Sequence, residues 1–133
     1  MSAELQGIGV ALVSVPRFEQ ALQRFGERFL ERIFSPAEIA YTRRKRHGTQ
    51  NLAARFAAKC AGRALLRSHG ARGLRLRDFE VERRPSGEPT LVLHRAAREA
   101  EATSALRFSL SLTHDAELAL ASLWALRGLR PGP

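Results

Sequence analysis

The sequence predicts an α+β domain in which a small antiparallel sheet packs against a long central helix. Both ends of the chain carry apolar runs or period-two alternation, which is typical of strands, whereas the middle carries helical spacing. With 133 residues, the chain is long enough to bury a core without disulfides or metals. We expect one domain over residues 1–126 and a disordered tail over residues 127–133.

The first part of the chain predicts a strand followed by short helices. Residues 5–15 are mostly apolar and contain two glycines, which indicates a buried strand. Pro16 suits the first turn of a helix, and the spacing over residues 17–24 and 28–34 predicts two helical pieces. The run Ser35-Pro-Ala-Glu38 has the pattern of a capping box, which predicts that a further helix begins there.

Residues 51–67 are expected to form the central helix. Apolar side chains recur there at the spacing of one buried face. A basic stripe repeats at every fourth residue and consists of Arg55, Lys59, Arg63 and Arg67. Such a stripe is either a solvated helix face or a row of cations for a phosphorylated ligand, and spacing alone does not choose between them. Thr49 or Asn51 is expected to cap this helix, and Gly70 to end it.

After the central helix the apolar pattern changes to period two, which predicts two hairpins. The turn of the first hairpin is Pro85-Ser-Gly-Glu-Pro89. The expected elements are strands over residues 74–81 and 90–94, a short helix over residues 96–102, and strands over residues 106–112 and 118–126.

Charge and composition limit the classes of partner. The formal net charge is +9, so the surface attracts polyanions such as acidic proteins or phosphorylated small molecules. Nucleic acid is not expected, because the basic runs lack interleaved aromatic residues. A single cysteine excludes an internal disulfide. No apolar run reaches the length of a membrane span, and we expect a cytoplasmic protein without membrane contact.

Four motifs occur in a characteristic order: Gly7–Arg17, Arg55–Lys59, Pro85–Pro89 and Ser111–His114. With this order and spacing, the chain resembles the holo-(acyl-carrier-protein) synthases of the 4'-phosphopantetheinyl transferase superfamily. Members of this family move 4'-phosphopantetheine from coenzyme A to a serine of an acyl carrier protein. The resemblance implies a trimer with active sites between neighbouring subunits.

The resemblance also shows what is missing. The family holds Mg²⁺ with an aspartate in the first strand and a glutamate in the central helix, and these positions are Ala11 and Cys60 here. A family lysine linked to proton transfer falls on Ala64, and the neighbouring Arg63 points about 100° away around the helix. We therefore expect no protein ligand for a metal and weak or absent Mg²⁺ binding. Cys60 itself is expected to be either a small buried apolar residue or a thiol activated by Lys59.

The binding residues of the family are better preserved. The resemblance assigns contacts with coenzyme A to Arg55, Lys59, Arg63 and His114, and makes His114 and Lys59 the candidate catalytic residues. The alternative for His114 is an ordinary turn histidine that bonds to the backbone. Docking of the acidic carrier protein is assigned to Arg17, Arg24, Arg28 and Arg32, for which an arginine-rich surface without a partner is the alternative.

Three hypotheses for function follow from the resemblance. The leading one is a degenerate synthase homologue, a pseudoenzyme that retains binding of coenzyme A, acyl carrier protein or both but transfers phosphopantetheine poorly. The second is an active transferase that recruits its metal through other acids, with Asp115 and Glu38 as candidates. The third is a non-catalytic interaction subunit of a fatty-acid or polyketide synthase system. A homotrimer is expected, and a hetero-oligomer is the alternative.

Overall fold

The computed structural model describes residues 3–128, and it has the expected α+β architecture. In chain order the elements are β1 (Ala3–Ser14), α1 (Val15–Ile33), α2 (Pro36–Arg43), α3 (Gly48–Ser68), the 3-10 helix η1 (Leu76–Asp78), β2 (Phe79–Arg83), β3 (Pro89–Leu93), α4 (Arg95–Ser104), β4 (Arg107–His114) and β5 (Leu118–Gly128).

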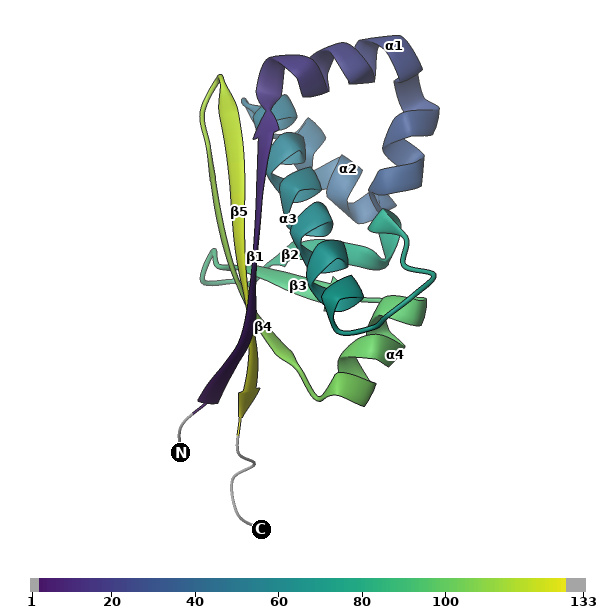
Figure 1. The fold of residues 1–133 in the computed structure, drawn as a ribbon. Coiled ribbons are helices and arrows are strands. Elements are labelled where there is room, and N and C mark those ends of the chain that lie inside the picture. The colour runs from purple at the N-terminus through teal and green to yellow at the C-terminus, as the bar shows by residue number, and fades with distance from the viewer. Residues whose placement is uncertain (1–2, 129–133) are drawn as a thin grey trace.

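One antiparallel sheet, in the order β1-β5-β4, is covered on one face by α3, and the hairpin β2–β3 lies beside it (Figure 1). The strand β1 approaches α3 very closely. A Cβ atom on Gly9 would lie 2.9 Å from the carbonyl oxygen of Ala61, and one on Gly7 would lie 2.8 Å from Leu65. The next inward residue, Ala11, packs against the cluster that contains Ala57 and Ala58, one turn earlier in α3.

Helix α1 consists of two pieces joined at Gly26, as the sequence predicted. Gly26 has φ 68° and ψ −153°, a backbone conformation that is almost confined to glycine. The helix therefore changes direction there, so its second half descends along the side of the molecule opposite the sheet (Figure 1). The next helix, α2, begins with the predicted capping box, in which the side chains and backbone amides of Ser35 and Glu38 bond reciprocally.

Four expectations about local structure are wrong. Strand β1 is not buried on both sides, since alternate side chains face away from α3. Neither Thr49 nor Asn51 caps α3, whose N-cap residue is His47 and has no side-chain bond. The segment expected as a strand from residue 74 instead forms η1 before β2 begins. The disordered tail was expected from residue 127, but β5 continues to Gly128, which pairs with β1. Residues 129–133 lie outside the described part of the chain.

Candidate functional site

The two positions that the resemblance assigns to the metal lie on β1 and on α3, which pack against each other. Ala11 is partly buried and packs against Ala57, Ala58 and Ala121. Cys60 is half-buried, and burial raises the pKa of its thiol, although the cations of Arg63 and Lys59 oppose this. A thiol held protonated is a poor nucleophile and a poor metal ligand. The geometry therefore favours the expectation of a small packing residue over that of an activated thiol.

The donors at this crossing do not fit Mg²⁺, which prefers carboxylate oxygens. Ala11 has no ligand atom, and among residues 3–128 no three His, Cys, Asp or Glu side chains are arranged to hold a metal ion. Glu38, one of the two acids considered as replacement metal ligands, is buried, and both of its carboxylate oxygens accept hydrogen bonds. Asp115, the other, caps a turn, where its Oδ1 atom accepts bonds from the amides of Glu117 and Leu118 at 2.8 Å.

Two cations of the basic stripe lie inside the protein. The side chains of Arg55 and Lys59 are 4% and 0% exposed, so neither belongs to a solvated face. The Nζ atom of Lys59 donates to Oε1 of Glu38 at 2.7 Å and also to the carbonyl oxygen of Phe79. The Nη1 atom of Arg55 donates to the carbonyl oxygen of Val81 at 2.6 Å and lies 3.7 Å from Oε2 of Glu38.

This buried cluster, which consists of Glu38, Arg55 and Lys59, links three elements. Glu38 belongs to α2 and both cations belong to α3, while their carbonyl partners lie in β2. Burial lowers the pKa of Lys59 below its ordinary value, and the Glu38 carboxylate opposes this shift. Every buried side-chain nitrogen and oxygen in residues 3–128 has a hydrogen-bond partner, so the cluster is fully satisfied. Direct contact of Arg55 or Lys59 with coenzyme A stays a prediction.

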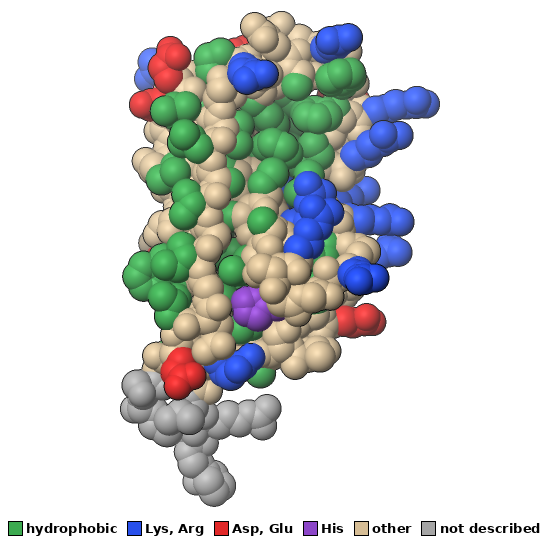
Figure 2. Space-filling model, viewed as in Figure 1, with side chains coloured by type: hydrophobic (Ala, Val, Ile, Leu, Met, Phe, Trp, Pro, Cys, Tyr) green, Lys and Arg blue, Asp and Glu red, His purple; other side chains and the backbone are tan. Residues whose placement is uncertain are grey.

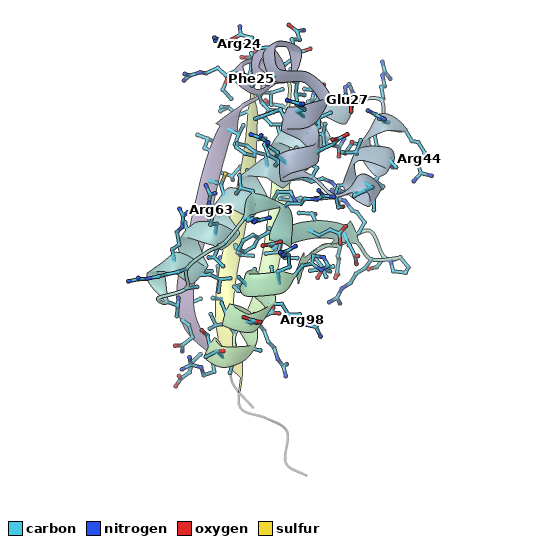
Figure 3. The ribbon with its side chains drawn as sticks, turned by 90° about the vertical axis from the view of Figure 1, so that its right-hand side faces the viewer. Arg24, Phe25, Glu27, Arg44, Arg63 and Arg98 are labelled. Atoms are coloured by element: carbon cyan, nitrogen blue, oxygen red, sulfur yellow. The ribbon has the colours of Figure 1, made fainter. Side chains whose placement is uncertain are left out.

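The other two cations of the basic stripe, Arg63 and Arg67, are accessible to solvent, unlike Arg55 and Lys59. Arg63 is partly exposed and Arg67 is exposed. Figure 3 labels Arg63, whose side chain projects outward from α3. Ala64, at the position of the family lysine, is exposed and has only a methyl group to offer. The stripe thus provides accessible cations only beyond Cys60, one helical turn past the buried pair.

His114 lies at the end of β4 and is half-buried. Its Nδ1 atom is 2.9 Å from Oε1 of Gln50 on α3. With that oxygen as acceptor, Nδ1 carries the proton and Nε2 keeps a free electron pair. Burial lowers the pKa of His114, and the nearby charges of Arg83 and His47 lower it further. His114 is therefore a neutral imidazole near neutral pH, in the form that accepts a proton.

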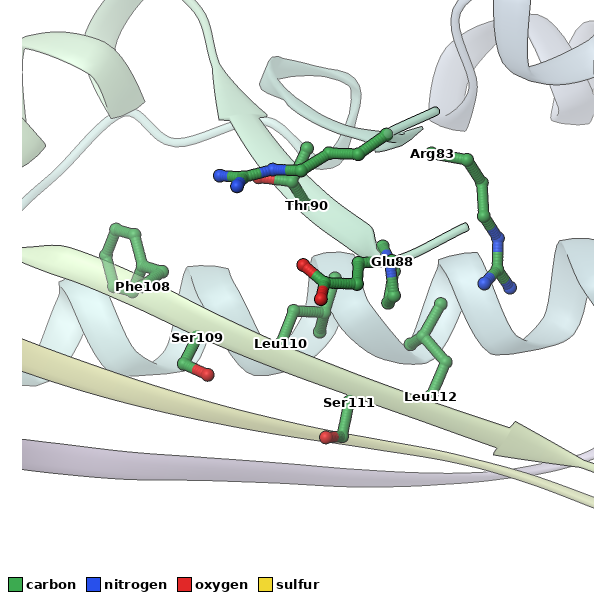
Figure 4. Close-up of a pocket in the computed structure, with 10 residues that line it drawn as sticks. Arg83, Glu88, Thr90, Phe108, Ser109, Leu110, Ser111 and Leu112 are labelled. Atoms are coloured by element: carbon green, nitrogen blue, oxygen red, sulfur yellow. The ribbon is translucent and has the colours of Figure 1, made fainter. Parts of the chain in front are cut away.

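A hollow of about 540 Å³ lies between the β2–β3 hairpin and β4 (Figure 4). Phe108, Leu110 and Leu112 of β4 point toward the hairpin, whereas Ser109 and Ser111 point to the other side of the strand (Figure 4). The hairpin contributes Arg83, Glu88 and Thr90. Arg83 stands near the end of β4 that leads to His114. Neither Arg83 nor Gln50 was predicted as a site residue, because only the fold brings them to His114.

The arginines predicted to dock a carrier protein all lie exposed on α1. Figure 2 shows Lys and Arg side chains gathered on the side of the molecule where α1 descends in Figure 1. Gly26 divides these arginines into two pairs, since it separates Arg17 and Arg24 from Arg28 and Arg32. Arg24 and Phe25 lie together at the bend, with the guanidinium carbon of Arg24 5.3 Å from the ring centre (Figure 3).

The fold and the crossing of β1 with α3 define a known class of protein. The model of the 4'-phosphopantetheinyl transferase superfamily matches residues 7–121, and the chain belongs to this superfamily. Within it, the chain is 44% identical over 118 residues to a holo-[acyl-carrier-protein] synthase from Koribacter versatilis, covering 88% of this chain and 94% of the relative. A synthase from Solibacter usitatus is also 44% identical, over 116 residues, covering 86% of this chain and 93% of the relative.

Solved structures agree with this assignment. The Neisseria meningitidis holo-[acyl-carrier-protein] synthase superposes with a TM-score of 0.80 at 28% identity and covers 92% of this chain and 98% of its own. The Helicobacter pylori synthase, solved in complex with coenzyme A, superposes with a TM-score of 0.75 at 30% identity, covering 90% and 99%. The predicted family and fold class are therefore confirmed. No helix within residues 3–128 combines the length and apolar character needed to cross a membrane.

Proposed function

We propose that this protein binds coenzyme A and an acyl carrier protein, and that it transfers phosphopantetheine poorly even when Mg²⁺ is supplied. The observation that carries the proposal is the crossing of β1 and α3, where Ala11 and Cys60 replace both family carboxylates. An alanine methyl group ligates nothing, and a cysteine thiol prefers softer metals than Mg²⁺. Because the surrounding fold resembles that of the synthases, loss of the metal ligands does not require loss of the binding surfaces.

Binding of coenzyme A is supported by the hollow beside β4. Arg83 and Arg84 line it, and cations are the usual partners of phosphate groups. We assign Arg55 and Lys59 an indirect role, because their bonds to the carbonyls of β2 fix the strand that ends in Arg83. Arg63 is the accessible cation nearest Cys60 on α3 and is the remaining candidate for a phosphate contact.

A homo-oligomer is supported by the face of the sheet that α3 does not cover. Ile8, Val10 and Leu12 are 52%, 62% and 61% exposed there, and Trp124, which pairs with Ile8, is 47% exposed. In Figure 2 hydrophobic side chains follow β1 and β5 along this edge of the molecule. Contiguous exposed apolar side chains favour a protein interface, and we assign this face to the trimer that the resemblance implies. Val10→Lys should then lower the mass measured by light scattering, whereas an unchanged mass would reject this face as the interface.

Mass spectrometry of a purified apo-carrier protein tests the proposed activity. The wild type should convert it near the background rate at millimolar Mg²⁺, whereas a variant with both Ala11→Asp and Cys60→Glu should convert it measurably. Each single substitution serves as a matched control and should do little, since one carboxylate leaves the ion mostly to water and phosphate. Adding Ala64→Lys to the double variant should raise conversion further.

Calorimetry with coenzyme A separates the hypotheses that remain. The wild type should bind coenzyme A without Mg²⁺, and its affinity should fall as salt rises. Robust conversion by the pure wild type would refute the proposal and identify an active transferase. Carrier binding without any coenzyme A binding would instead identify an interaction subunit.

A further inference from the structure

A second basic surface lies beside α1 and was not predicted from the sequence. A hollow of about 530 Å³ is lined by Arg28, Glu31 and Arg32 of α1 and by Arg75 and Arg77 of the segment that leads into β2. All four arginines are exposed. We call this surface the arginine hollow. Only two of its arginines, those of α1, belong to the set that the resemblance assigns to carrier docking.

The arginine hollow is built by two local features of this chain. The bend at Gly26 turns the second half of α1 toward η1, and the two elements are in contact. Leu76 packs into the same apolar cluster as Phe29, which anchors η1 against α1. Arg75 and Arg77 flank that anchor and remain exposed, so their side chains join those of α1 around the hollow.

The charges of the arginine hollow are not neutralised within the chain. Within residues 3–128, none of its four arginine side chains forms a hydrogen bond or an ion pair with an acidic side chain. Among residues 3–128, Glu31 is the only acid that lines the hollow. Four guanidinium groups beside a single carboxylate repel one another, and a negatively charged partner would relieve that repulsion.

The surroundings favour a protein partner over a small phosphorylated ligand. The hollow is shallow and all of its cations are exposed, whereas a small-molecule site encloses most of its ligand. A neighbouring pocket is lined by Arg28 and Arg32 together with Phe25 and Phe29, and Phe25 is 57% exposed. Exposed aromatic side chains beside arginines are typical of protein interfaces.

We propose that Arg75 and Arg77 form a second arm of the docking surface and bind acidic side chains of the carrier protein, in an inference that rests on the proposed function. The α1 arginines would then contact one part of the carrier protein, and the arginines of the segment before β2 would contact another part. Docking would thus depend on η1 as well as on α1. Exposed charges that steer a partner act mainly on association and on its salt dependence.

Fluorescence anisotropy of a labelled apo-carrier protein, titrated with the full-length protein, tests this inference. The test variant carries Arg75→Glu and Arg77→Glu. A matched control carries Arg95→Glu and Arg98→Glu, which make the same change in net charge at exposed sites on α4; Arg98 lies far from the bend of α1 in Figure 3. The test variant should bind the carrier about tenfold more weakly or worse, with a shallower salt dependence. The control should bind nearly as well as the wild type.

Other outcomes overturn the inference in distinguishable ways. If Arg28→Glu weakens carrier binding and the test variant does not, the second arm is absent but the proposed function stands. If test and control variants weaken equally, only the overall charge matters. If coenzyme A affinity falls while carrier affinity does not, the hollow binds phosphate instead. If the wild type binds no carrier at all, both this inference and the carrier part of the proposed function fail.

Discussion

The buried cluster makes a strong prediction about stability, tested by Glu38→Gln. The Oε1 atom of Glu38 accepts bonds from Nζ of Lys59 at 2.7 Å and from the amide of Ser35 at 3.0 Å. The Oε2 atom accepts a bond from the amide of Val81 at 3.1 Å and faces Arg55. All of these partners are donors, so an amide NH₂ at either position meets another donor. The substitution also removes the carboxylate that pairs with both buried cations.

The expected loss of stability follows from the cost of removing one partner of a buried ion pair. Removing one partner of such a pair costs about 3–5 kcal/mol of unfolding free energy. For a domain of this size, that corresponds to a fall in Tm of about 10–15 °C. The measurement is equilibrium denaturation in urea, with wild type and variants at one protomer concentration, because the proposed oligomer would make stability depend on concentration.

The chain offers a matched control in its exposed pair between Glu27 and Arg43. These side chains lie 2.8 Å apart but are 65% and 62% exposed. Glu27→Gln should therefore cost about 0.5 kcal/mol or less. Combining Glu38→Gln with Lys59→Met should recover part of the lost stability, since one buried cation is removed with it. If Glu38→Gln costs no more than Glu27→Gln, the buried cluster does not hold α2, α3 and β2 together.

Three further predictions concern single groups. NMR titration should place the imidazole pKa of His114 below its ordinary value. The unfolded state then binds the proton more tightly, so the folded state loses stability as the pH falls from the pKa of the unfolded state to that of the folded state. Arg83→Gln should raise the pKa of His114, whereas Arg84→Gln should not. Gly26→Ala should lower the unfolding free energy by about 1–3 kcal/mol in the same urea assay. The cause is backbone strain alone, because no atom lies within 4 Å of the added Cβ. An unchanged stability would mean that α1 straightens at this position. Cys60 should react with iodoacetamide at neutral pH more slowly than an unperturbed cysteine, and faster alkylation would show an activated thiol after all.

The sequence determined the features that depend on residues close together in the chain. The capping box of Ser35 and Glu38, the division of α1 near Gly26 and the span of α3 all follow from spacing within a few residues, and the structure confirms them. The order of the four motifs was likewise enough to predict the family. The absence of a carboxylate at Ala11 and Cys60 is a fact of the sequence and needs no coordinates.

Only the tertiary structure decided the environment of the basic stripe. Its spacing allowed a solvated face or a row of cations for a ligand, yet Arg55 and Lys59 are enclosed and bonded to a carboxylate on another helix and to carbonyls of β2. Burial and pairing depend on groups 20 to 26 positions away, which helical periodicity does not specify. The arginine hollow has the same origin, since Arg75 and Arg77 meet α1 only because the bend at Gly26 and the anchor of Leu76 bring distant segments together.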